Sequence, residues 1–205
     1  MFISPIDEIL AEFKLGKFVI MVDNLNRENE GDLMLAAEFV DAAKINFMLR
    51  EARGMICLAI TETQAAILEL PIMKSVKHPS TKSHAAFTYS IEAAKGVTTG
   101  ISANERAHTM LTAIRPQCIP ADVVCPGHVF PIVARSGGVL VREGHTEAGV
   151  DLSQLAMLNP SAVLCEILDD SGSAAENVFL KNFSEKFNIK IGSVDDLVSF
   201  RKRLQ

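Results

Sequence analysis

Hydrophobic positions along the 205-residue chain follow two spacings, and their alternation predicts helices interleaved with strands. Apolar residues at every third or fourth position predict helices, which we place at 5–15, 42–53, 62–70, 103–115, 147–158, 174–187 and 194–203. Short apolar or alternating runs predict strands, which we place at 17–22, 33–37, 55–61, 87–91, 129–134, 138–141, 162–168 and 189–191.

Residues that favour helix ends mark several of these boundaries. Ser4 can cap the first helix, Pro5 suits its first position, and Gly16 is placed to end it. Asp41 can cap the second helix. The segment SANE at 102–105 is a capping box, in which a serine and a glutamate three residues later satisfy each other's N–H groups.

The order of these elements predicts the fold class. Strands that follow each other directly form antiparallel pairs, whereas strands joined through a helix form parallel ones. We therefore expect an α+β fold, with a mixed sheet covered by helices on both faces. No repeat or linker divides the chain, which predicts one domain over 1–205. A doubly wound nucleotide-binding fold is excluded because no Gly-x-Gly-x-x-Gly follows the first strand.

Composition narrows the classes of function. A net charge of -5 and 6% aromatic residues without Trp argue against a nucleic-acid partner. Four cysteines without Cys-x-x-Cys spacing indicate reduced thiols. The N-terminus lacks the pattern of a signal peptide, and the apolar runs are too short to cross a bilayer. We expect a cytoplasmic protein with no membrane partner.

The acidic run RENEGD at 27–32 is the first candidate site. In an extended segment Glu28, Glu30 and Asp32 would face one side, and their mutual repulsion would favour a hard cation such as Mg²⁺ or Mn²⁺. Arg27 could hold an anionic or hydroxyl-rich substrate. The alternative is a charged turn facing solvent, which we favour from this run alone.

The second candidate site is REGHTE at 142–147, which leads into a predicted helix. Its presence makes a functional site at the acidic run more plausible than a charged turn facing solvent. Thr146 and the N–H groups of a helix N-terminus suit a phosphate, and Arg142 adds a fixed positive charge. His145 lies in a glycine-flanked turn with polar neighbours, so that a metal-ligand role and a structural role are equally plausible.

Three further residues have both a structural and a chemical interpretation. His128 stands at the edge of a predicted strand, where a hydrogen-bonded structural role is the simpler one. Glu166 could be a buried acid–base group or lie at the exposed end of its strand. Cys57 is best interpreted as a small core residue.

Taken together, these segments resemble the 3,4-dihydroxy-2-butanone 4-phosphate synthase family of riboflavin biosynthesis, from about Ile6 to Arg201. The resemblance rests on five stretches, which are RENEGDLMLAAE (27–38), FTYSIEAAKGVTTGISANERAHT (87–109), PGHVFP (126–131), GGVLVREGHTEAGVDL (137–152) and CEILDDSG (165–172).

The resemblance implies a lyase that converts ribulose 5-phosphate into 3,4-dihydroxy-2-butanone 4-phosphate and formate. It also implies a three-layer α-β-α fold and a homodimer with sites near the subunit interface. The expected cofactor is Mg²⁺ or Mn²⁺, with two ions per site. The implied roles are metal binding by Glu28 and His145, substrate binding by Arg27, Asp32, Arg142, Thr146 and Glu166, and catalysis by His128 and Glu166.

Two departures from the family pattern bear on these expectations. Residues 173–176 read SAAE where the family usually has Thr-Met-Ala-Arg, so that Glu176 reverses a charge. The loop 74–86 differs from the usual polar, glycine-containing pattern. We expect the monofunctional form, without a fused cyclohydrolase. A sugar-phosphate isomerase and a binding protein without turnover are the alternative functions.

Overall fold

The computed structural model describes residues 3–24, 27, 29–74 and 85–205. The α-helices of this part of the chain are α1 (Ile6–Lys14), α2 (Ala42–Phe47), α3 (Glu62–Ile67), α4 (Ala103–Ala113), α5 (His145–Leu155), α6 (Asn177–Phe187) and α7 (Val194–Arg203), and a π-helical turn at Met48–Ala52 continues α2. Its strands are β1 (Val19–Val22), β2 (Gly31–Ala36), β3 (Cys57–Thr61), β4 (Ala86–Phe87), β5 (Ile91–Ala93), β6 (Val123–Ala134), β7 (Ala162–Glu166) and β8 (Ile191–Ser193).

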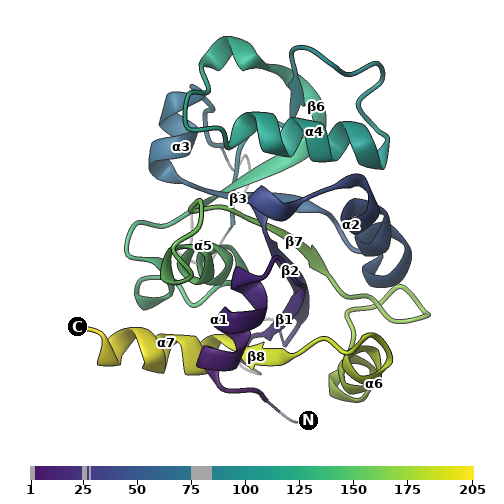
Figure 1. Cartoon of the computed structure of the whole chain (residues 1–205), viewed down its shortest axis with the longest axis vertical. Coiled ribbons are helices and arrows are strands. Elements are labelled where there is room, and N and C mark those ends of the chain that lie inside the picture. Colours follow the sequence, from purple (N-terminus) through teal and green to yellow (C-terminus); the bar gives the residue numbers. More distant parts are fainter. Residues whose placement is uncertain (1–2, 25–26, 28, 75–84) are drawn as a thin grey trace.

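The strands form one mixed sheet in the order β4-β6-β3-β7-β2-β1-β8, with β5 paired to β6. The pairs β1–β8 and β3–β6 are parallel, whereas β1–β2, β2–β7, β3–β7, β4–β6 and β5–β6 are antiparallel. The predicted mixed sheet is therefore confirmed. Figure 1 shows α5 and α7 on one side of this sheet and α2 and α6 on the other.

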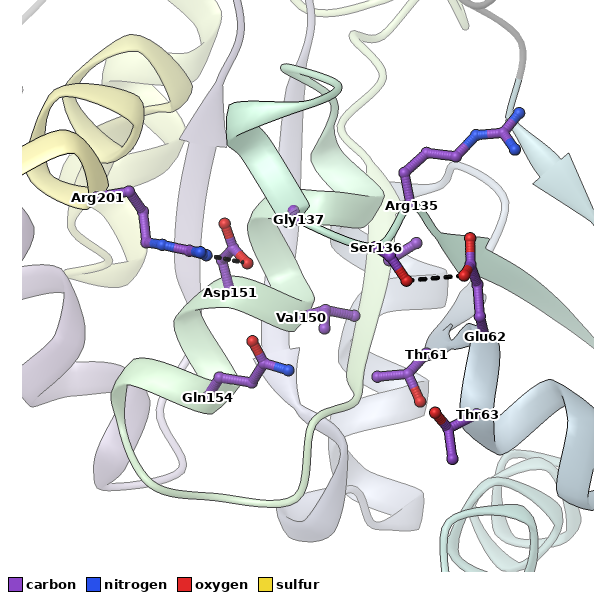
Figure 2. Close-up of a pocket in the computed structure, with 12 residues that line it drawn as sticks. Thr61, Glu62, Thr63, Arg135, Ser136, Gly137, Val150, Asp151, Gln154 and Arg201 are labelled. Atoms are coloured by element: carbon purple, nitrogen blue, oxygen red, sulfur yellow. Dashed lines mark hydrogen bonds and ion pairs between the residues drawn. The ribbon is translucent and has the colours of Figure 1, made fainter. Parts of the chain in front are cut away.

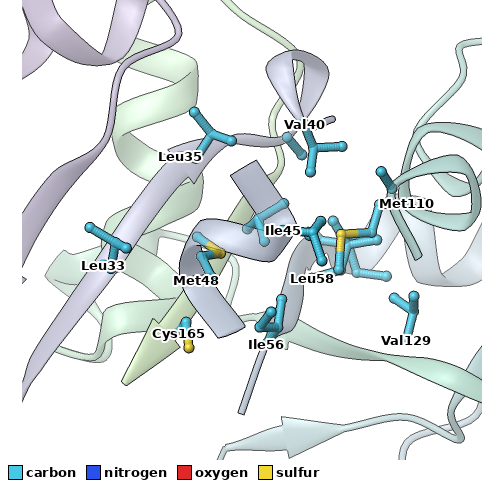
Figure 3. Packing of buried hydrophobic residues seen from close by; sticks show 14 of the residues in the cluster. Leu33, Leu35, Val40, Ile45, Met48, Ile56, Leu58, Met110, Val129 and Cys165 are labelled. Atoms are coloured by element: carbon cyan, nitrogen blue, oxygen red, sulfur yellow. The ribbon is translucent and has the colours of Figure 1, made fainter. Parts of the chain in front are cut away.

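One layer of the core lies between the sheet and α2, α4 and α6. Alternate side chains of β2, Leu33 and Leu35, point into it, where they join Ile45 of α2 and Met110 of α4 (Figure 3). The other β2 side chains, Met34 and Ala36, point to the opposite face and pack in a cluster with α1, α5 and α7. Because the sheet is buried on both faces, the three-layer α-β-α architecture is confirmed.

Local signals at helix ends were largely reliable. The Asp41 carboxylate accepts the Lys44 N–H at 2.7 Å, and the Ser102 hydroxyl accepts the Glu105 N–H at 3.2 Å, as predicted for caps. The prediction that Ser4 caps the first helix was wrong, because Pro5 occupies the N-cap position of α1 and no side chain caps this helix.

One predicted strand was wrong and another was right only in part. The run 138–141 forms a short 3₁₀ turn (Gly138–Leu140), because Gly137 and Gly138 have φ of 96° and 63° and a strand cannot contain these angles. The run 87–91 is split between β4 and β5. The last strand is shifted to Ile191–Ser193, and α6 begins at Asn177 rather than 174.

None of the helices in the described ranges combines the length and apolar character that a membrane span requires.

Candidate functional site

Two of the predicted site residues lie opposite each other at one edge of the sheet. Asp32 at the start of β2 pairs with Glu166 at the end of β7, because these strands are antiparallel. Side chains alternate along a strand, so both carboxylates point to the same face as Met34 and Leu164, which is the face that α5 covers. The start of β3 lies at the same edge, since β3 is also antiparallel to β7.

His145 completes this group from the helical layer. It is the first residue of α5, and its Nδ1 lies 3.6 Å from Asp32 Oδ1. Both residues are buried, with exposed fractions of 6% and 2%. Glu166 is half-buried, and its Oε2 accepts the Met55 N–H at 2.8 Å. The structure thus brings Asp32, His145 and Glu166 to one place.

Cys57 is buried at the start of β3 and belongs to the cluster on the same face of the sheet. Burial raises the pKa of this thiol strongly, and the negative charges of Glu166 and Asp32 raise it further. A protonated, buried thiol is a poor nucleophile. This agrees with the predicted role of Cys57 as a small core residue.

The acidic run folds back on a residue that the sequence did not single out. Asp23 Oδ2 accepts a hydrogen bond from Arg27 Nη1 at 2.6 Å, and Asp23 Oδ1 accepts the Glu30 N–H at 2.9 Å. Asp23 follows the last residue of β1, and its carboxylate therefore anchors both sides of the turn. Glu28, the predicted metal ligand, lies outside the described residues.

The second predicted segment forms the N-terminus of α5. Arg142 Nη1 donates to Glu147 Oε2 at 2.5 Å, and the two side chains are only 9% and 1% exposed. The second oxygen of Glu147 accepts the Arg135 N–H at 2.9 Å. Glu147 was missed as a partner of Arg142, although it stands five residues away. Thr146 is buried in the first turn of the helix.

His128 lies apart from these residues. It belongs to β6, which pairs with β3 on the side opposite to β7, so that β3 separates His128 from Glu166. At the usual spacing of about 4.8 Å between strands, the backbones of β6 and β7 are roughly 10 Å apart. Its ring Nδ1 lies 2.7 Å from Glu92 Oε2, a residue that was also missed.

The residues at this edge fit a divalent ion only in part. An imidazole nitrogen and a carboxylate oxygen, as His145 and Asp32 provide, are ligands that Mg²⁺ and Mn²⁺ accept. Within the described ranges no three His, Cys, Asp or Glu residues converge closely enough to hold an ion. A complete set therefore needs a further ligand, and Glu28 is the sequence-based candidate for it.

A separate hollow of about 220 Å³ lies at the other ends of β3 and β6, where Thr61 and Ala134 line it. Asp151 of α5 and Arg201 of α7 form an ion pair there, and Glu62 accepts a hydrogen bond from Ser136 at 2.7 Å (Figure 2). Burial raises the pKa of Asp151. Among the residues that the structure describes, none of the predicted site residues lines this hollow.

One of the two departures from the family pattern, Glu176, lies within the described residues. Glu176 is the N-cap residue of α6, is exposed, and makes no capping hydrogen bond. The other, the loop 74–86, falls mainly on residues 75–84, which lie outside the described ranges.

Comparisons with known proteins identify the family of this chain. The sequence profile of the family described as 3,4-dihydroxy-2-butanone 4-phosphate synthase matches residues 7–200. The 3,4-dihydroxy-2-butanone 4-phosphate synthase of Neisseria meningitidis serogroup A is 51% identical over 203 residues, which are 99% of this chain and 55% of that protein. The chain thus spans about half the length of this relative.

Two further relatives extend the comparison. The riboflavin biosynthesis protein RibBA of Synechocystis is 52% identical over 200 residues, 97% of this chain and 36% of that protein. A solved 3,4-dihydroxy-2-butanone 4-phosphate synthase in complex with two magnesium ions has a TM-score of 0.88 and 36% identity, with coverage of 98% of this chain and 97% of that one. This chain therefore belongs to the 3,4-dihydroxy-2-butanone 4-phosphate synthase family.

Proposed function

We propose that this chain is a lyase that converts D-ribulose 5-phosphate into L-3,4-dihydroxy-2-butanone 4-phosphate and formate, as a step of riboflavin biosynthesis. The observation that carries the proposal is the meeting of Asp32, His145 and Glu166 at one edge of the sheet, beside the N-terminus of α5. The family assignment over residues 7–200 supports the same reaction.

The overall reaction balances without an oxidant or reductant. Removal of the C3 proton of the ketose gives an enediol, and loss of water then removes the C1 hydroxyl. A skeletal rearrangement follows, and C4 leaves as formate after one water is taken up. The water released and the water consumed cancel, so that one five-carbon substrate gives one four-carbon product and one formate.

Side chains in the described part of the chain suit the proton transfers of this reaction. Glu166 is held by the Met55 N–H and faces the same side of the sheet as Asp32, so either carboxylate can accept a proton from a substrate bound between them. His128 is a third candidate for proton transfer.

Divalent metal is the proposed cofactor, with Mg²⁺ or Mn²⁺ bound by His145 and Glu28 and two ions per site. When bound, such an ion polarises the C2 carbonyl and acidifies the C3 proton. The solved relative that holds two magnesium ions supports this choice of metal. His145 contributes an imidazole nitrogen, a ligand that these ions accept.

We place the substrate phosphate at the N-terminus of α5. The first N–H groups of an eleven-residue helix point out of its end and, with the helix dipole, favour an anion. Arg142 and Thr146 lie at this end, and the ion pair with Glu147 fixes the Arg142 guanidinium in place. Arg27 and Asp32 then hold the hydroxyl-bearing part of the chain.

A homodimer with its sites near the interface is also part of the proposal. Tyr89, Ile101 and Val124 are each about half exposed, at 53%, 55% and 50%, and lie on segments that flank Glu92 and His128. Exposed apolar side chains close to a site favour a contact with another subunit. Light scattering should give a mass of twice 22.3 kDa, and a mass of 22.3 kDa would contradict the dimer.

The reaction is tested by incubating the purified chain with ribulose 5-phosphate and Mg²⁺ and measuring formate. Formate should accumulate in step with loss of substrate, cease after EDTA treatment, and resume when Mg²⁺ or Mn²⁺ is returned. Pentose-phosphate isomers formed without formate would instead indicate an isomerase. Tight binding of ribulose 5-phosphate without any product would indicate a binding protein.

A further inference from the structure

A second group of polar side chains surrounds His128 where β5 meets β6. The His128 Nδ1 atom lies 2.7 Å from Glu92 Oε2, and the Thr109 hydroxyl donates to Glu92 Oε1 at 3.2 Å. The Thr109 oxygen in turn accepts the Ala93 N–H at 3.0 Å. Both carboxylate oxygens of Glu92 thus have a partner, and the residue is only 8% exposed.

The backbone around this contact is shaped to permit it. Ile91 pairs with Val129, but the next residue, Glu92, pairs with Val124, so that residues 125–128 of β6 bulge out of the ladder. Gly127 lies so close to the Ile91 carbonyl that a Cβ atom there would overlap it. This close approach brings the neighbouring His128 ring onto the Glu92 carboxylate.

A loop closes over the other side of the same carboxylate. Gly100 has a φ of 81° and packs so tightly against the Glu92 carboxylate that a side chain at this position would displace it. The loop is tied to the start of α4 by Glu105, whose Oε1 accepts the N–H and the hydroxyl of Thr98 at 2.5 and 2.7 Å. These bonds lower the pKa of Glu105 to about 2.

The Glu92 carboxylate determines which ring nitrogen of His128 carries the hydrogen. An ionised carboxylate only accepts hydrogen bonds, so Nδ1 of His128 must carry the hydrogen of this contact. In the neutral ring Nε2 then carries the lone pair. The His128 side chain is 44% exposed, so the ring is open to a ligand, whereas the Glu92 side chain, at 10%, is enclosed.

We propose that Glu92 is a positioning residue for His128, which holds the imidazole in the Nδ1–H tautomer so that Nε2 can exchange a proton with the substrate. This rests on the proposed function, in which His128 is one of three candidates for proton transfer. A buried carboxylate that orients a histidine in this way sets both its tautomer and its direction. Thr109 supports the carboxylate from α4.

Glu92→Gln is the direct test, because it keeps the size of the side chain and removes its charge. An amide can donate as well as accept, and the Nδ1–H tautomer is then no longer enforced. We expect kcat for formate release to fall by about 10- to 1000-fold with KM within about twofold, the pattern of a group that acts after binding. Thr109→Val should lower kcat by less than about tenfold, because the carboxylate remains.

The matched control is Glu62→Gln, which alters an exposed glutamate that hydrogen-bonds Ser136 far from β5. It should leave kcat within twofold of the wild type. A Glu92→Gln enzyme that is folded by circular dichroism and also retains kcat within twofold would overturn the proposal.

A measurement on the wild type needs no substrate and does not depend on the folding of Glu92→Gln. The ¹⁵N resonances of the histidine rings, with His128 assigned by its loss in His128→Gln, should show a protonated Nδ1 and an unprotonated Nε2 in alkaline buffer. The opposite tautomer would overturn the proposal. If the wild type releases no formate, the proposed function fails. The spectra still test whether Glu92 holds His128 in the Nδ1–H tautomer.

Discussion

Replacing His145 by Ala is expected to lower kcat for formate release by at least about 1000-fold. A metal that polarises a carbonyl contributes several kcal/mol to the transition state, and each 1.4 kcal/mol is worth a factor of ten. His145 is the one proposed metal ligand that lies within the described residues, 3.6 Å from the Asp32 carboxylate. Loss of its nitrogen should also weaken binding of Mn²⁺, which calorimetry can measure without substrate.

The same variant separates a metal ligand from a structural histidine. Without metal, His145→Ala should change the free energy of unfolding by no more than about 1 kcal/mol, which is roughly 2–4 °C in Tm for a chain of this size. His108→Ala is the matched control, since His108 is exposed and its ring Nε2 lies 2.9 Å from the Lys95 carbonyl oxygen. Full turnover by His145→Ala, or a large loss of apo stability, would reject the ligand role.

Replacing Arg142 by Met should destabilise the fold by about 3 kcal/mol, the lower end of the cost of breaking a buried ion pair. The change leaves the Glu147 carboxylate, which is 1% exposed, with the Arg135 N–H but without its cation. For a chain of this size Tm should fall by roughly 6–12 °C, as measured by calorimetry. The KM for ribulose 5-phosphate should rise as well, because Arg142 is also proposed to bind the phosphate.

Two controls make this prediction specific. Lys181→Met removes the exposed pair with Glu185, whose side chains are 57% and 65% exposed, and should cost less than about 1 kcal/mol. The double change Arg142→Met with Glu147→Leu should recover most of the lost stability, because no buried charge remains. An Arg142→Met protein as stable as Lys181→Met would show that the pair contributes little. An unchanged KM with a lower kcat would contradict the phosphate role.

The features that were predictable from sequence depend on nearby residues. Asp41 and Ser102 were identified as caps because each bonds an N–H only three residues away. The alternation of apolar residues also placed most strands. The run 138–141 was wrongly predicted as a strand because its valines and leucine suit a strand or a buried turn equally well. The positive φ of Gly137 and Gly138 produces a turn instead.

The candidate site was predictable only as a set of separate segments. That Asp32 faces Glu166 depends on the register of two strands 134 residues apart, and sequence spacing says nothing about this register. The resemblance to a family supplied the roles, but it did not indicate that Asp23 anchors Arg27. Glu92 lay within a quoted stretch and was not singled out, because its contact with His128 needs a bulge that the strand pattern conceals.

The proposed lyase removes one particular carbon, C4, from ribulose 5-phosphate. Substrate labelled with ¹³C at C4 distinguishes this reaction from other fragmentations. Followed by NMR with Mg²⁺ present, the label should appear in formate, one formate per substrate consumed, while the four-carbon phosphate product stays unlabelled. Label that remains in the phosphate ester, or formate that carries none, would contradict the claim.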